Sequence, residues 1–177
     1  MDFELGGLRV ALESVGGFSQ SYEPLGGVAR LRMMGGALVQ QVSWRRLATT
    51  LSGEGWWPSG IENLDYDAPL ELKCAAPRSV IGQTATLVLP AARRTDTGFE
   101  PIGHAIVPGQ GTVVGGGDLV PTALSLSGDT ATLTPVTGAT AYQVTYWPQI
   151  TVMADPPQME GSLSDAQHRW TLRAEEV

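Results

Sequence analysis

The feature that most constrains this chain is an alternation of apolar and polar side chains with a period of two. In Leu8–Glu13 every second residue is large and apolar, and in Ala29–Met33 two arginines alternate with apolar residues. Successive side chains of an extended strand point to opposite faces, so both segments are predicted to be half-buried strands. No segment of ten residues shows clear helical spacing. The sequence therefore predicts an all-β fold: an antiparallel β-sandwich or barrel-like core with a smaller β lobe and a long Gly-rich loop.

Turn chemistry and aromatic positions refine this prediction. Met34–Ala37 is expected to be a hairpin turn because its two glycines adopt positive φ without steric cost. A polar loop is expected over residues 16–27, between two pairs of glycines. Trp44, Tyr142, Tyr146 and Trp170 are expected in the core, since they lie within or beside alternating segments. Further strands are predicted at residues 38–42, 46–51, 70–74, 84–89, 102–107, 130–134, 141–146, 150–152 and 169–173.

Changes in composition along the chain predict its organisation. Residues 1–90 are expected to form the main β domain and residues 119–177 a β lobe that can pack on it. Between them, residues 91–118 contain Gly109–Gly117, a span so rich in glycine that a linker or assembly arm is expected.

Charge and cysteine content exclude several classes of protein. The net charge of −7 opposes binding to the phosphate backbone, so no specific nucleic-acid binding is expected. An acidic wall would still suit a conduit through which DNA slides without sticking. Cys74 has no disulfide partner and is expected in the core. No apolar run is long enough to cross a membrane, and the chain is expected to fold in the cytoplasm.

No catalytic signature is present, so we expect no enzyme, no cofactor and no metal. His104 and His168 lack Cys or His neighbours at metal-ligand spacing, and the glycines of 109–117 do not have the spacing of a dinucleotide-binding loop. The acidic segment 62–67 offers oxygen ligands for calcium without the EF-hand pattern, and turn formation is the simpler interpretation.

The adjacent Trp56 and Trp57 lie in a loop rich in Gly, Pro and Asp. Neighbouring residues of an extended chain diverge, so only one of the two indoles can easily point inward. Contact with another protein, cover by the loop itself, and a stacking platform for a sugar are all open. The candidate residues for a subunit interface are Trp56, Trp57, Tyr66, Arg93, Arg94, Phe99, Val113 and Val114.

Two stretches resemble known families. Residues 30–80, RLRMMGGALVQQVSWRRLATTLSGEGWWPSGIENLDYDAPLELKCAAPRSV, resemble a segment of small virion structural proteins found in the tail tips and baseplates of tailed bacteriophages. Residues 130–146, TATLTPVTGATAYQVTY, are similar to the B and C strands of fibronectin type III modules. Thr134 stands near the place of the usual tryptophan, and too few residues follow for all seven strands. A partial or modified sandwich lobe is expected.

The phage resemblance implies a distal-tail-like structural protein, located in the virion tail and assembled in the host cytoplasm. It implies a homo-oligomeric ring around the DNA channel, in contact with other tail or baseplate proteins. A capsid decoration or head-to-tail joining protein would belong to the same structural class. A carbohydrate-binding module for host attachment, with Trp56, Trp57 and Tyr66 as the platform, is the alternative of another class.

Overall fold

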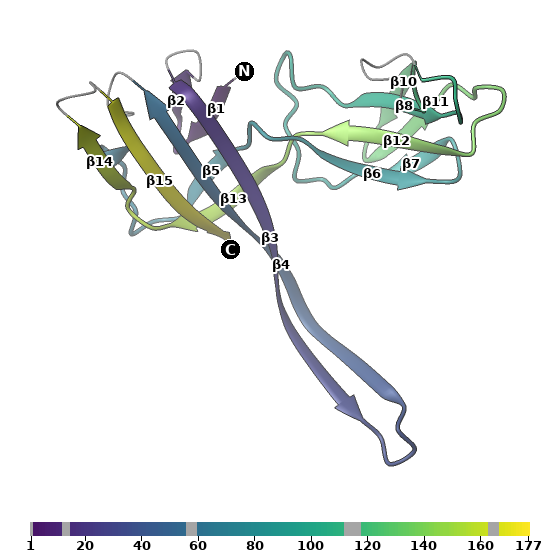
Figure 1. Ribbon diagram of the computed structural model, residues 1–177, viewed down its shortest axis with the longest axis horizontal. Coiled ribbons are helices and arrows are strands. Elements are labelled where there is room, and N and C mark those ends of the chain that lie inside the picture. Colours follow the sequence, from purple (N-terminus) through teal and green to yellow (C-terminus); the bar gives the residue numbers. More distant parts are fainter. Residues whose placement is uncertain (1, 12–14, 56–59, 112–117, 163–166) are drawn as a thin grey trace. The chain divides into compact units, whose positions relative to one another are not determined.

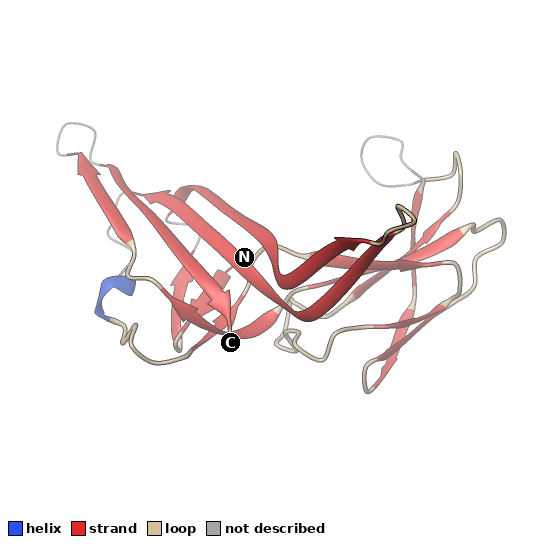
Figure 2. Cartoon of the chain, turned by 90° about the horizontal axis from the view of Figure 1, so that it is seen from below, coloured by secondary structure: helices blue, strands red, loops and turns tan. Residues whose placement is uncertain are grey.

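A computed structural model describes residues 2–11, 15–55, 60–111, 118–162 and 167–177. Strands are the dominant element, and the only helical segment within these ranges is the 3₁₀ turn Ile61–Asn63 (Figure 2). The strands form three sheets of antiparallel pairs, none of which closes into a barrel. The prediction of an all-β fold is confirmed.

The chain divides into two compact units that differ from the predicted domains. Unit 1 comprises Met1–Leu72 and Ile150–Val177, and unit 2 comprises Lys73–Gln149. Unit 2 is thus an insertion, because the last strands of the chain return to the first sheet. The predicted boundaries at residues 90 and 118 fall inside unit 2.

Unit 1 contains an eight-stranded sheet (Figure 1). Seven strands follow the order β2-β1-β5-β13-β15-β4-β3, and β14 pairs with β15 off this path. One edge of β15 pairs with β4, while its other edge is shared between β14 and the end of β13. The strands are β1 (Asp2–Leu5), β2 (Leu8–Ala11), β3 (Val15–Arg32), β4 (Leu38–Gly55), β5 (Leu70–Lys73), β13 (Gln149–Ala154), β14 (Gln158–Ser162) and β15 (Gln167–Glu176).

The core of unit 1 follows from the alternation of β4 and β15. Leu51 lies opposite Leu172 across the pair, and both side chains are fully buried. Two residues further along β4, on the same face of the sheet, Gly53 lies opposite Trp170. The ring of Phe3 on β1 lies 5.6 Å from the ring of Trp170, so the sheet curves enough to bring β1 against the face of β15. Trp170 is buried, as predicted.

Unit 2 is a sandwich of two sheets. The order of one sheet is β10-β11-β7 and that of the other is β6-β12-β8-β9. A single cluster of buried side chains from both sheets includes Leu87 and Leu133 on one side and the predicted core residues Tyr142 and Tyr146 on the other. The strands are β6 (Arg78–Gly82), β7 (Thr86–Val88), β8 (Ile102–Ile106), β9 (Leu119–Thr122), β10 (Leu124–Ser127), β11 (Thr130–Leu133) and β12 (Ala141–Tyr146).

The longest strands of the chain, β3 and β4, form one hairpin. Its turn lies where it was predicted: Gly36 has φ 79°, and the N–H of Met33 donates to the carbonyl of Ala37. The prediction of a polar loop over residues 16–27 is wrong, because β3 runs through both glycine pairs. The pairing of β3 with β4 shifts register between Val15 and Gly17 and between Gly27 and Val28, and these shifts let the strand accommodate the glycine pairs.

Candidate functional site: an exposed hairpin arm

The outer half of the β3–β4 hairpin extends beyond the rest of the sheet (Figure 1). Strand β15 pairs with β4 only over Ala48–Gly55. Beyond this pairing, the side chain of Arg46 donates a hydrogen bond to the backbone carbonyl of Val177, the residue that follows β15. Within the described part of the chain, residues 28–42 pair only with each other. We call residues 28–42 the arm.

A β-bulge marks the root of the arm. Gly27 pairs with Trp44 and Val28 pairs with Val42, which leaves Ser43 as the extra residue on β4. Such a bulge bends the strand and increases its twist, and the hairpin changes direction in Figure 2. A side chain on Gly27 would be crowded by the indole of Trp44, since a Cβ there would lie 2.6 Å from Nε1.

The pairing register divides the arm into two different faces. Directly paired residues share a face, and faces alternate along each strand. One face, which we call the apolar face, carries no charge; the other, which we call the arginine face, carries two guanidinium groups. The apolar face is Ala29, Leu31, Met33, Val39 and Gln41, and the arginine face is Val28, Arg30, Arg32, Leu38, Gln40 and Val42.

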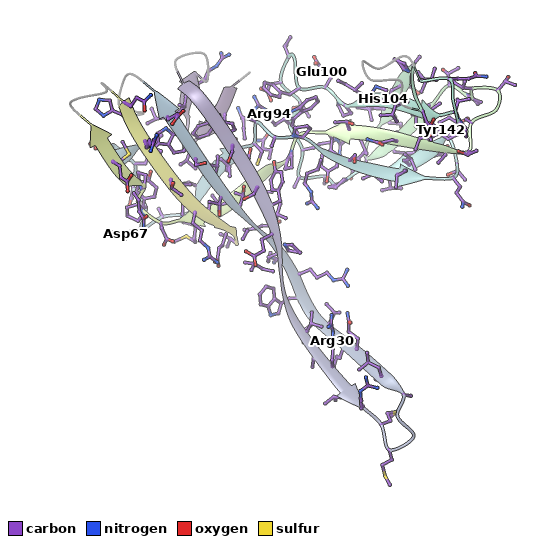
Figure 3. All side chains as sticks on the ribbon, viewed as in Figure 1. Arg30, Asp67, Arg94, Glu100, His104 and Tyr142 are labelled. Carbon is purple, nitrogen blue, oxygen red and sulfur yellow. The ribbon has the colours of Figure 1, made fainter. Side chains whose placement is uncertain are left out.

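Both faces are exposed. The strand predicted at Ala29–Met33 is confirmed over residues 29–32 by β3. Leu31 and Met33 are each 63% exposed, so its predicted half-burial is wrong. Trp44, predicted in the core, is 51% exposed. Figure 3 shows side chains, including Arg30, along the ribbon of the arm. The alternation in this region is real, but the described residues of unit 1 supply no second layer over either face. The other exposed large apolar residues of the arm are Val28, Met34, Leu38, Val39 and Val42.

Such exposure is unfavourable for an isolated ribbon. A two-stranded hairpin is only marginally stable in water without packing on one face. Burying a single leucine- or valine-sized side chain contributes about 1.5–3 kcal/mol, so cover over either face would stabilise the arm strongly. A contiguous exposed apolar surface of this kind is typical of a site of protein contact.

The arm region also has a charge opposite to that of the molecule. Residues 24–47 contain Arg30, Arg32, Arg45 and Arg46 and no acidic residue, a net charge of +4. The whole chain carries −7, so the remainder carries −7 minus +4, or −11. This separation of charge is visible in the sequence, and it is the signal by which sequence reasoning could have found the arm.

Unit 1 also contains an acidic groove of roughly 390 Å³ on the outer face of β13 and β15. Glu175 lies on β15 opposite the half-exposed Met153 of β13, and Asp155 directly follows β13. The ion pair of Arg173 with Glu175 lines the same groove. The lining is completed by Tyr66, Asp67, Ala154 and Pro156. We call this the acidic groove; Asp67 is labelled in Figure 3.

Among the predicted interface residues, Tyr66 is the one that lines this groove. Its hydroxyl donates to the carbonyl of Ile61 at 2.6 Å. Burial, with a smaller contribution from the charge of Glu62, raises the pKa of the Tyr66 hydroxyl. Trp56, Trp57, Val113 and Val114 lie outside the described residues.

Arg93, Arg94 and Phe99 have structural contacts within unit 2. Arg94 is buried; it forms two hydrogen bonds with the Asp96 carboxylate, donates to the carbonyl of Cys74 at 3.0 Å, and lies 3.2 Å from the ring centroid of Phe99. Arg93 bonds Asp129 at 2.7 Å and two backbone carbonyls. These side chains hold together loops of unit 2, whereas Tyr66 belongs to unit 1.

The histidines, the cysteine and the acidic residues are the possible metal ligands in the sequence. No group of three or more potential metal ligands lies together within the described residues. His104 lies on β8 and His168 on β15, in different units, and Cys74 is buried as predicted. No helix in the described ranges is long and apolar enough to cross a bilayer.

Compared with known proteins, the chain matches no protein-family model and no curated sequence.

Proposed function

We propose that this chain is a non-enzymatic structural subunit of a bacteriophage tail tip or baseplate, and that it assembles as a ring around the DNA channel through its hairpin arm. The observation that carries the proposal is the exposure of both faces of the arm. A segment with this much uncovered apolar surface is stabilised when a neighbouring subunit packs on it. The phage resemblance of residues 30–80 includes most of the arm, and it supplies the kind of assembly.

The topology of unit 2 supports the other resemblance. A fibronectin type III module has an A-B-E sheet and a C′-C-F-G sheet. If β11 and β12 are B and C, as the sequence of residues 130–146 suggests, the two sheets of unit 2 match when β10 is A, β7 is E, β6 is C′, β8 is F and β9 is G. We propose that unit 2 is a circularly permuted module of this kind. In that case the strands of unit 2 follow one another along the chain as C′-E-F-G-A-B-C. The strands that come after C in an ordinary module then precede residues 130–146 in this chain.

Shortening the arm tests the main proposal. Ala29 and Gln41 are directly paired and lie four steps from the hydrogen-bonded pair Met33–Ala37, so they form a hydrogen-bonded pair themselves. Replacing residues 30–40 with Asn-Gly therefore closes the hairpin with a two-residue type I′ turn. The wild-type chain is expected to sediment as a multimer with increasing concentration, and negative-stain images are expected to show rings. The shortened chain is expected to sediment as a monomer with an unchanged circular dichroism spectrum.

A matched control shows that the effect comes from the arm. The substitution Ile81→Ser changes an exposed apolar residue of β6 in unit 2 and should leave the multimer intact. If the wild-type chain is a monodisperse monomer at high concentration, or if the shortened chain assembles as well as the wild type, the proposal is wrong.

A further inference from the structure

The charge of the arm restricts what can cover it. The arm, residues 28–42, carries +2 from Arg30 and Arg32, and the wider segment 24–47 carries +4 and no acid, so two arms packed together would bring like charges into contact. Like charges placed face to face oppose association, and complementary ones favour it. The remaining −11 of each chain provides a complementary surface on any second copy. The partner that charge favours is therefore the negatively charged remainder of a second copy of this chain, outside its residues 24–47.

The acidic groove matches the arginine face in chemistry. Asp67, Asp155 and Glu175 offer carboxylates, of which only Glu175 has an ion pair that is described, with Arg173 at 3.0 Å. Guanidinium groups form the stronger, charge-assisted class of hydrogen bond with carboxylates. The exposed Met153 lies among these acids, and a thioether adapts readily to an apolar partner.

The arginine face presents the same combination. Arg30 and Arg32 lie two residues apart on β3 and point to one side, with Leu38 directly opposite Arg32. Their present hydrogen bonds, from Arg30 to Gln40 at 3.2 Å and from Arg32 to the carbonyl of Gly36 at 3.2 Å, are to neutral and exposed acceptors. Carboxylates would replace these acceptors favourably, and Leu38 would meet an apolar side chain.

Building on the proposed function, we propose that the arginine face of the arm docks in the acidic groove of a second copy of this chain. The arm and the groove are different patches, so the contact is heterologous, and every subunit donates one arm and receives one. A chain of such contacts closes into a ring when the rotation between subunits allows it. The apolar face of the arm is then left for the next component of the assembly.

Charge reversal tests this contact on both sides. Arg30→Glu with Arg32→Glu gives an arm variant, and Asp67→Arg with Asp155→Arg gives a groove variant. Each alone is expected to weaken self-association at least tenfold in sedimentation, and wild-type association is expected to weaken with added salt. An equimolar mixture is expected to reassemble, because the wild-type arm of one variant fits the wild-type groove of the other, and the two reversed surfaces also match.

The control is Glu160→Arg on β14, an exposed acid outside the groove, compared with Asp155→Arg alone. The docking site is wrong if the groove variant associates like the wild type, or if the mixture fails to reassemble while both variants keep their circular dichroism spectra. In either case loss of assembly on arm shortening would still support the proposed function. If the arm variant instead loses binding to duplex DNA without any change in self-association, nucleic acid is the occupant and the inference falls.

Discussion

Two tryptophans in unit 1 each pack over a glycine of a neighbouring strand, but only one of the two indoles is buried. A Cβ on Gly53 would lie 2.7 Å from the indole of Trp170, and a Cβ on Gly27 would lie 2.6 Å from that of Trp44. Trp170 is 3% exposed because Phe3 packs against it from β1. Trp44 has the same local arrangement without such a cover. Burial here is decided by the second layer, and an alternating sequence does not show where that layer ends.

The Arg94–Asp96 pair gives unit 2 a dependence on pH. Hydrogen bonds from Arg94 are the main cause that lowers the pKa of the Asp96 carboxyl below its usual value. A lowered pKa in the folded state adds stability above the unfolded pKa of about 3.9, and this stability is lost as the pH falls through the folded value. The contribution is therefore present at neutral pH and disappears below about pH 4.

The substitution Asp96→Asn tests this dependence. At pH 7 we expect unit 2 to lose about 1 kcal/mol of unfolding free energy, the upper range for a pair that solvent screens, because the Asp96 side chain is 39% exposed. The difference from the wild type should shrink as the pH falls below about 4. Urea unfolding at several pH values measures it, and Glu100→Gln in the same loop region is the control. A difference independent of pH would contradict the assignment.

At the scale of elements, the sequence predicted strands where alternation was clear, and it missed the short strands β1, β6, β9, β10 and β14. The strand predicted at residues 141–146 matches β12, and the turn at 34–37 is in place. The segment 16–27 was not predicted, because glycine pairs are typical of loops and β3 instead accommodates them at register shifts. The arm was missed for a related reason: its strands were recognised, but their full length and lack of cover depend on pairing over the whole hairpin.

The bulge at Ser43 is expected to set the direction of the arm. Deleting Ser43 would let Gly27–Trp44 and Val28–Val42 become consecutive regular pairs, and the local bend should relax. We expect self-association to weaken at least fivefold, since the arm would point away from its site on the neighbour. The thermal unfolding midpoint should stay the same or rise, because one unpaired residue is removed.

Sedimentation and thermal melts of the same preparation separate these two effects. The control is Ser43→Ala, which keeps the bulge and should assemble like the wild type. Unchanged association after the deletion would mean that the bend has no part in assembly.

At the scale of the whole molecule, the sequence could not reveal the insertion. Local alternation predicts that β5 and β13 are strands, but not that they are neighbours in one sheet across the 77 residues of Lys73–Gln149. The similarity of residues 130–146 to fibronectin strands pointed correctly to a sandwich. It suggested a partial lobe at the C-terminal end, because the strands that complete the two sheets come earlier in the chain.

The two connections to unit 2 lie side by side, so the units should be separable. The N–H of Cys74 donates to the carbonyl of Pro148 at 3.0 Å, and β5 and β13 are neighbours in the sheet of unit 1. Replacing residues 73–149 with a short Gly-Asn-Gly linker should therefore leave the sheet, the arm and the acidic groove in place. We expect this chain to fold and still to form the multimer, because both proposed contact surfaces belong to unit 1.

Residues 73–149 alone should fold as a monomer, since each sheet of unit 2 covers the other. Circular dichroism and sedimentation of the two halves measure both outcomes. If the linked unit 1 folds but stays monomeric while the whole chain assembles, unit 2 carries a contact that the arm does not supply.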